Sequence, residues 1–171
     1  MERAVITGMG VISPLGNDIA SFWGKLARGE SGIARIDTFD VSRYKSQIAG
    51  MVRDFDAVGR FGRKEAQRMD RFCQFALAAA EQAWTDAGLD SETVDRERLG
   101  VYVGSGVGGL GTLLQQEAQL RDRGPERVSP LLVPMMISNM AAAQLSIRFG
   151  AWGPTLSPVT ACSLSATPSA S

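Results

Sequence analysis

Apolar positions along the chain fall into short β-branched runs and longer helical repeats. The short runs, bounded by glycine or proline, predict buried strands at Ala4–Thr7, Gln47–Val52, Leu99–Val103 and Thr155–Thr160. The clearest helical repeat covers residues 65–87, where apolar side chains recur at steps of three and four and Gly88 supplies a C-terminal stop. Its many alanines leave room for a neighbouring backbone to approach closely.

Three further helices follow from the same pattern. Asp18 is a good N-cap for a helix through about Arg28, a polar helix covers Leu113–Arg123, and another runs from Pro134 to about Phe149. The alternation of strands and helices predicts the α/β class, with a largely parallel sheet and flanking helices. No internal repeat, linker or domain break is evident.

Composition narrows the functions that this fold could serve. Lysine plus arginine equals aspartate plus glutamate, 18 each, which gives no support for binding nucleic acid. We interpret the basic stretch Arg60–Lys64, followed by Glu65, as a solvated face. The chain has no histidine, so no imidazole base or histidine metal ligand exists within it. We expect neither a metal nor another cofactor.

The sequence also suggests a compartment. The first residues include an acid and lack the apolar run of a signal peptide, and no apolar stretch reaches the 18 residues of a membrane span. We therefore expect no membrane association and a cytoplasmic location, where thiols stay reduced.

Two cysteines are the candidates for nucleophilic chemistry. Cys162 ends a predicted strand and precedes small residues, which is how a nucleophile elbow is built, although a lone cysteine at a strand end is more often a core residue. Cys73 lies on the apolar stripe of a helix and reads as a small hydrophobic core residue.

The glycine-rich turn Gly104–Gly109 fits the pattern G-x-G-x-x-G between a strand and a helix. This is the context of a dinucleotide site, but no acid stands about twenty residues further on at the end of a second strand. Glycines in such a turn equally allow close approach of another backbone or of an acyl chain.

Five segments in order and spacing make a more specific pattern. They are VITGMGVISPLG (5–16), DRFCQFALAAA (70–80), GSGVGGLG (104–111), SPLLVP (129–134) and TAC (160–162). Together they resemble the elongating β-ketoacyl-acyl-carrier-protein synthases of type II, over residues 1 to about 163.

The resemblance implies a fold, a reaction and partners. It implies the thiolase-like fold, of which residues 1–163 would be an incomplete N-terminal half, and a homodimer in the full-length protein. Cys162 would be the nucleophile that takes an acyl group from acyl-carrier protein, and its own N–H would form part of the oxyanion hole. Malonyl-carrier protein would then lose carbon dioxide and its carbanion would attack the thioester. Val107 would lie near the acyl pocket.

The chain also departs from this family. The family's decarboxylation uses two histidines and a lysine from its second half, so we expect no condensation by these 171 residues alone. The tail, residues 164–171, does not continue as the family does. With a GC-rich choice of codons, Ala166–Ser171 shifted by two bases reads His-Ala-Ile-Gly-Glu, a family-like continuation. We therefore hypothesise an interrupted or frameshifted reading frame.

Three other interpretations remain. The chain could be a fragment of a polyketide ketosynthase, or resemble the chain-length-factor subunits of polyketide systems, which usually replace the nucleophile that is kept here as Cys162. A dinucleotide-binding module built on the glycine turn is the third. Neither acyl chain length nor the choice between fatty-acid and polyketide pathways follows from the sequence.

Overall fold

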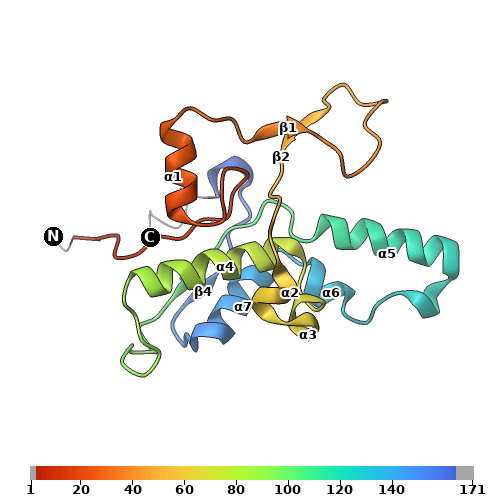
Figure 1. Cartoon of the computed structure of the whole chain (residues 1–171). Coiled ribbons are helices and arrows are strands. Elements are labelled where there is room, and N and C mark those ends of the chain that lie inside the picture. Colours follow the sequence, from red (N-terminus) through yellow and green to blue (C-terminus); the bar gives the residue numbers. More distant parts are fainter. Residues whose placement is uncertain (1–2, 165–171) are drawn as a thin grey trace. The chain divides into compact units, whose positions relative to one another are not determined.

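A computed structural model describes residues 3–164, and the predicted tail at 164–171 falls outside it except for Leu164 (Figure 1). The chain forms two compact units. The first comprises the chain up to Asp56 together with Ala78–Gly88. The second comprises Ala57–Leu77 and the chain from Leu89 onward. Each unit is described by itself.

The first unit combines a helix, a two-stranded sheet and the last part of a long helix. Its elements are α1 (Ile19–Ala27), β1 (Ile33–Arg35), β2 (Ile48–Gly50) and the second half of α4 (Arg71–Asp86). The prediction for α1 is confirmed, because Oδ1 of Asp18 accepts a hydrogen bond from the Ser21 N–H at 2.8 Å. Gly29, with φ of +69°, follows the helix end, and its N–H donates to the Leu26 carbonyl.

The alanine-rich face of α4 receives a neighbouring backbone, as the sequence suggested. A Cβ on Gly10 would lie 1.9 Å from the Ala79 carbonyl oxygen, so only glycine permits this approach. The N–H groups of Met9 and Val11 donate to side chains of α4, at Asp86 and Gln82. The N-terminal segment is therefore held by a helix.

The prediction of a strand at Ala4–Thr7 is wrong. The segment has no strand pairing among the described residues, and Val5 and Ile6 are 77% and 85% exposed. A β-branched run forms a strand only where another strand supplies its hydrogen bonds, and here the adjacent backbone groups bond to helix side chains instead.

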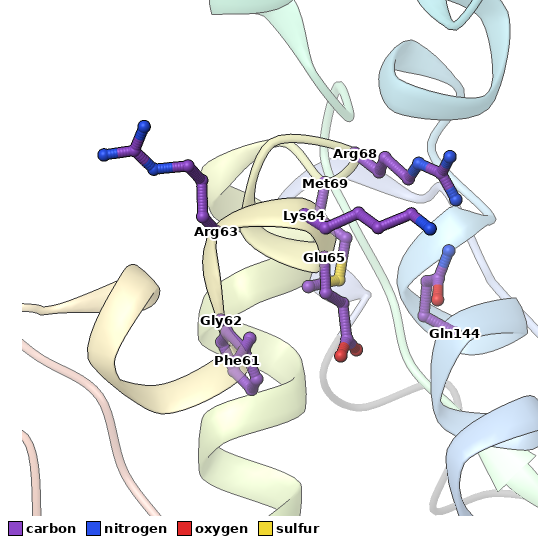
Figure 2. Close-up of a pocket in the computed structure, with 8 residues that line it drawn as sticks. All are labelled: Phe61, Gly62, Arg63, Lys64, Glu65, Arg68, Met69 and Gln144. Atoms are coloured by element: carbon purple, nitrogen blue, oxygen red, sulfur yellow. The ribbon is translucent and has the colours of Figure 1, made fainter.

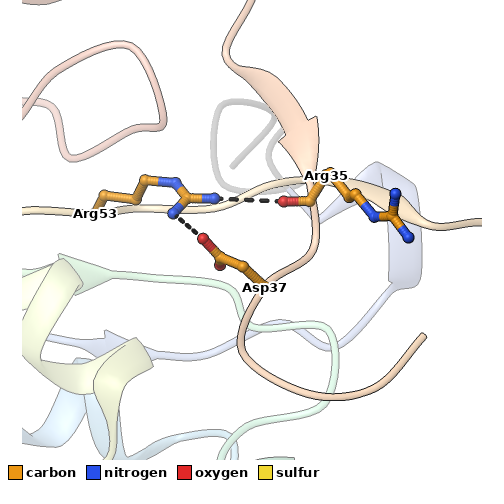
Figure 3. A network of polar contacts seen from close by, with 3 residues as sticks. All are labelled: Arg35, Asp37 and Arg53. Carbon is orange, nitrogen blue, oxygen red and sulfur yellow. Dashed lines mark hydrogen bonds and ion pairs between the residues drawn. The ribbon is translucent and has the colours of Figure 1, made fainter. Parts of the chain in front are cut away.

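A charged contact accompanies the antiparallel pair β1–β2 (Figure 3). Nη1 of Arg53 lies 2.6 Å from Oδ2 of Asp37, and Nη2 donates to the Arg35 carbonyl at 3.4 Å. The hydrogen bond from Arg53 lowers the pKa of Asp37 below its ordinary value. This contact links the residues just after β1 to those just after β2.

The second unit is built mainly of helices around a two-stranded parallel sheet. Strands β3 (Val101–Tyr102) and β4 (Thr155–Leu156) pair in parallel, with Val101 opposite Thr155. Its other elements are α2 (Ala57–Phe61), α3 (Arg63–Ala66), the first half of α4, α5 (Leu110–Arg123), the 3₁₀ turn Pro125–Arg127, α6 (Leu132–Met136), α7 (Met140–Phe149) and the 3₁₀ turn Ala161–Ser163. Helix α7 packs beside both strands and buries Ala141, Ala142 and Leu145.

Two predicted helices are interrupted. The helix expected over 65–87 is divided into α3 and α4, and the buried side-chain amide of Gln74 donates to the carbonyls of Ala66 and Met69 across the break. The helix expected from Pro134 to Phe149 is divided into α6 and α7, and the Met136 carbonyl at that break accepts the Gly109 N–H at 2.8 Å. Carbonyls that a continuous helix would use are thus bonded elsewhere.

The prediction of a mixed α/β class is confirmed. The prediction of one largely parallel sheet is not confirmed by the described strands. The described strands make two small sheets, one antiparallel and one parallel. The predicted strand Thr155–Thr160 ends at Leu156, and Pro158 beyond it has no N–H to donate to a ladder. Within residues 3–164, no helix has the length and apolar character to cross a membrane.

Candidate functional site

Cys162 stands in a tight turn shortly after β4. The Thr155–Leu156 ladder leads through Pro158 to the 3₁₀ turn Ala161–Ser163. Ala161, immediately before the cysteine, has φ of +51°, a left-handed conformation that residues with a side chain seldom adopt. The Ser163 N–H and hydroxyl both donate to the Thr160 carbonyl, at 3.2 and 2.8 Å. The turn therefore presents the free thiol of Cys162 at an exposed position.

The glycine turn Gly104–Gly109 lies just after β3, and its last two glycines lie against backbone of α6. A Cβ on Gly108 would lie 2.3 Å from the Met136 carbonyl oxygen, and one on Gly109 would lie 2.5 Å from that of Met135. The space beside the start of α5 is therefore occupied by the backbone at the end of α6. This supports the close-approach interpretation of the glycines over the dinucleotide one.

The parallel pairing of β3 and β4 brings these two loops to the same end of the sheet. The Val103 N–H extends the ladder by donating to the Leu156 carbonyl at 3.1 Å. A Cβ on Gly104 would lie 2.7 Å from Cδ1 of Leu164, just past the cysteine turn. The structure thus places Val107 and Cys162 on adjacent loops at the carboxyl end of one strand pair, where α/β proteins commonly carry their sites. Val107 is 67% exposed.

The two cysteines differ sharply in environment. Cys73 is 2% exposed on α4, which confirms its interpretation as a core residue. Burial, aided by the nearby charge of Asp70, raises the pKa of the Cys73 thiol to about 12. That thiol stays protonated at neutral pH and is shielded from reagents, so Cys162 carries the accessible thiol of the two.

A basic pocket of about 590 Å³ lies between α3 and α7 (Figure 2). Lys64 and Arg68 extend toward Gln144 on α7, whereas Arg63 points away. Met69 is a buried part of the lining. Glu65, the one acid of α3, forms an ion pair with Arg148. The pocket therefore offers two cations that can bind an anionic group.

Sequence reasoning missed this pocket. We interpreted Arg60–Lys64, which is short and followed by Glu65, as a solvated face. Its three cations are exposed, but that interpretation did not reveal that Arg63 and Lys64 line a pocket. The signal that could have found the pocket is the repetition of cations at positions 63, 64 and 68 around a single acid. The partner of that acid stands 83 residues further along the chain, which no local pattern reveals.

Comparison with known proteins identifies the family. Residues 1–168 match the model of the β-ketoacyl synthase N-terminal domain. The chain is 46% identical to a 3-oxoacyl-[acyl-carrier-protein] synthase 2 of Synechocystis, over 94% of this chain and 39% of that protein. The chain thus spans about two fifths of the length of the curated relatives that it matches.

Solved structures agree on the fold. The ishigamide ketosynthase/chain length factor superposes with a TM-score of 0.79 at 26% identity, over 91% of this chain and 39% of that one. A type II PKS acyl-carrier protein in complex with its ketosynthase gives a TM-score of 0.72 at 23% identity, over 94% of this chain and 42% of that one. The chain belongs to the β-ketoacyl synthase family, and its fold is that of the family's N-terminal domain.

Proposed function

We propose that this chain carries the acyl-accepting part of a 3-oxoacyl-[acyl-carrier-protein] synthase of fatty-acid elongation. The observation that supports the proposal best is the exposed thiol of Cys162 in a left-handed turn beyond a parallel strand, beside the loop of Val107. The domain would be one part of a thiolase-like protein that works in the cytoplasm as a homodimer.

In the proposed reaction the Cys162 thiolate attacks the carbonyl carbon of an acyl group held as a thioester on acyl-carrier protein. A carbon–sulfur bond forms to Cys162, the bond to the carrier's sulfur breaks, and the carrier thiolate leaves and takes up a proton. Negative charge collects on the carbonyl oxygen between these events. The N–H of Cys162 would stabilise that charge as part of an oxyanion hole.

Condensation would complete the cycle in the whole protein. Malonyl-carrier protein loses carbon dioxide, and the resulting carbanion attacks the acyl-cysteine thioester. The products are a 3-oxoacyl-carrier protein and a free Cys162. Val107 would contact the acyl chain while it is bound, since its side chain is exposed on the loop beside the cysteine turn.

The basic pocket is the proposed contact for the carrier protein. A carrier delivers its acyl group on an arm attached through a phosphate, so an anionic group must lie near the protein whenever the thioester reaches Cys162. Lys64 and Arg68 supply positive charge in a pocket of the same compact unit that contains Cys162. A structural relative has been solved in complex with its acyl-carrier protein, which supports a carrier as the partner.

Acyl transfer to Cys162 is testable on the full chain. We expect incubation with palmitoyl-carrier protein to add the mass of one palmitoyl group, removable by hydroxylamine, as intact-protein mass spectrometry would measure. Cys162→Ala should abolish the addition. Cys73→Ala is the matched control and should keep it, because the Cys73 thiol is buried and protonated. Equal acylation of the Cys162→Ala variant would refute the role of Cys162.

Carrier docking has its own test. We expect Lys64→Glu with Arg68→Glu to weaken binding of palmitoyl-carrier protein about tenfold or more at low salt, measured by fluorescence anisotropy. Arg63→Glu reverses one charge at a lining residue whose side chain points away from Gln144, and should cost much less binding. If the double variant and the Arg63 variant weaken binding equally, a general charge effect explains the result and the pocket is not the contact.

A further inference from the structure

Arg148 holds the only acid of α3 away from the cations of the basic pocket. We propose that Arg148 is a positioning residue for the pocket: by binding Glu65, it leaves Lys64 and Arg68 available to an anionic partner. The inference rests on the carrier docking proposed above and adds a residue to it. Arg148 does not itself need to touch the carrier.

Arg148 is fixed from two directions. Its Nη2 forms an ion pair and hydrogen bond with Oε1 of Glu65. Its guanidinium also lies over the ring of Phe61, with Cζ 5.9 Å from the ring centroid. Phe61 lines the pocket, and Arg148 belongs to the last turn of α7. A planar guanidinium suits this double contact better than the ammonium of lysine does.

Glu65 also has cations of the pocket close to it in the sequence. Without Arg148, its carboxylate could pair with one of them. Glu65 precedes Arg68 by three residues and follows Lys64 directly, and the Arg68 N–H donates to the Glu65 carbonyl, so the chain is still coiled there. Side chains three positions apart on such a turn can meet. Within the described residues, Lys64 and Arg68 form no ion pair while Arg148 occupies the Glu65 carboxylate.

Removal of Arg148 should therefore weaken binding of the anionic partner by more than the loss of a single positive charge outside the pocket would. The freed Glu65 carboxylate would turn toward Arg68 and neutralise a cation that the partner needs. An incoming anion would have to displace that carboxylate before it could bind. The competition is electrostatic between partly exposed groups, so added salt should weaken it.

The test measures binding of palmitoyl-carrier protein to the full chain by fluorescence anisotropy at low and at high ionic strength. We expect Arg148→Met to weaken binding about threefold to tenfold at low salt, with a smaller effect at high salt. Glu65→Gln in the Arg148→Met background should restore binding to within about twofold of the original chain, because no carboxylate then competes. Arg148→Lys should retain most of the binding, since it keeps the charge.

The restoring variant separates positioning from support of the fold. If Arg148 only stabilised α7 and α3, Glu65→Gln would not recover the binding lost in Arg148→Met, and this result would overturn the inference. Unchanged binding of Arg148→Met would overturn it as well. Circular dichroism of each variant identifies any loss of folding, and if Arg148→Met unfolds, Arg148→Gln, which also removes the charge, takes its place with the same expected and contradicting results.

The same titrations separate this inference from the docking proposal. If Lys64→Glu with Arg68→Glu does not weaken binding, the docking proposal fails. If that double variant weakens binding but Arg148→Met does not, only the inference about Arg148 fails. Parallel titrations with the apo-carrier, which has no phosphate-linked arm, show whether the pocket binds the arm or the carrier's own surface. If the pocket binds the arm, the apo-carrier should bind more weakly and about equally to all the variants, whereas the same rank order of variants with the apo-carrier would assign the pocket to the carrier's own surface.

Discussion

At the scale of single residues, the chain contrasts two thiols of opposite character. Cys73 lies in the core of its unit, where burial raises its pKa to about 12. Cys162 is exposed in a turn whose preceding residue, Ala161, has a left-handed backbone. Reactivity in cysteine follows the accessible thiolate, so position in the fold decides which thiol can act.

Alkylation of the native chain should therefore be selective. We expect iodoacetamide near neutral pH to modify Cys162 while Cys73 stays unmodified, and both to react once the chain is unfolded in guanidinium chloride. Peptide mass spectrometry with and without denaturant measures the two sites separately. Modification of Cys73 in the native chain at a rate similar to that of Cys162 would contradict the buried position of Cys73.

Gly10 shows how closely backbones approach in the first unit. A Cβ at this position would lie 1.9 Å from the Ala79 carbonyl oxygen, and backbone cannot move aside as a flexible side chain can. We expect Gly10→Ala to lower the free energy of unfolding by about 1–3 kcal/mol. Urea titration followed by circular dichroism would measure it.

Gly111 is the matched control for that substitution. It lies in α5, and a Cβ there would meet nothing within 4 Å. Gly111→Ala should therefore be neutral or should stabilise the chain by about 0.5–1 kcal/mol through helix propensity. A loss of stability equal to that of Gly10→Ala would show that the close approach at Gly10 is not the cause.

At the scale of elements, α1 owes its start to a local carboxylate. Hydrogen bonds from Ser21, first from its backbone N–H and then from its hydroxyl, lower the pKa of Asp18 below its ordinary value. A carboxyl group with a lowered pKa in the folded state stabilises that state at pH values above its unfolded pKa. The contribution is lost as the pH falls through the lowered folded value.

The Asp18 cap should make the thermal midpoint depend on pH. Two substitutions separate this pH dependence from the hydrogen bond of the cap. We expect Asp18→Ala to lower the thermal midpoint at pH 7, because the Ser21 N–H loses its acceptor. Asp18→Asn should keep most of the midpoint, since an amide oxygen can still accept, but should lose the part of the acid dependence due to Asp18. Thermal scans by circular dichroism between neutral and acid pH test both statements. Identical acid dependence in Asp18→Asn would exclude the carboxylate as its source.

At the scale of the whole molecule, much apolar surface remains uncovered in the isolated chain. Helix α1 has no buried residue, and Trp23 on it is 64% exposed. In the second unit Trp152 is 70% exposed and Ile147 on α7 is 76% exposed. Soluble monomers rarely leave apolar patches of this kind open, because covering them releases water.

We therefore expect the isolated chain to self-associate. Dynamic light scattering should give a particle size that grows with protein concentration, and tryptophan emission should shift to shorter wavelength as association buries Trp23 and Trp152. Each tryptophan replaced in turn by glutamine identifies which surface associates. A chain that stays monomeric at high micromolar concentration, with a sharp unfolding transition, would contradict this expectation.

What the sequence determined by itself rests on short-range physics and on a set of motifs. The Asp18 cap, the buried face that includes Cys73, and the alanine face of α4 depend on residues a few positions apart, and the five motifs placed the chain in its family. Cys162 could be named from the sequence, since it ends one of those motifs, and its role as nucleophile stays a prediction.

Only the tertiary structure decided the features that depend on distant partners. The segment Ala4–Thr7 forms no strand, and the backbone just after it bonds to side chains of α4. The predicted helix over 65–87 breaks where the Gln74 amide donates to the carbonyls of Ala66 and Met69. The pairing of β3 with β4 brings the loops of Val107 and Cys162 to one edge. The ion pair of Glu65 with Arg148 spans 83 residues. Long-range hydrogen bonds and ion pairs leave no periodic trace in a sequence, so the packed fold alone reveals them.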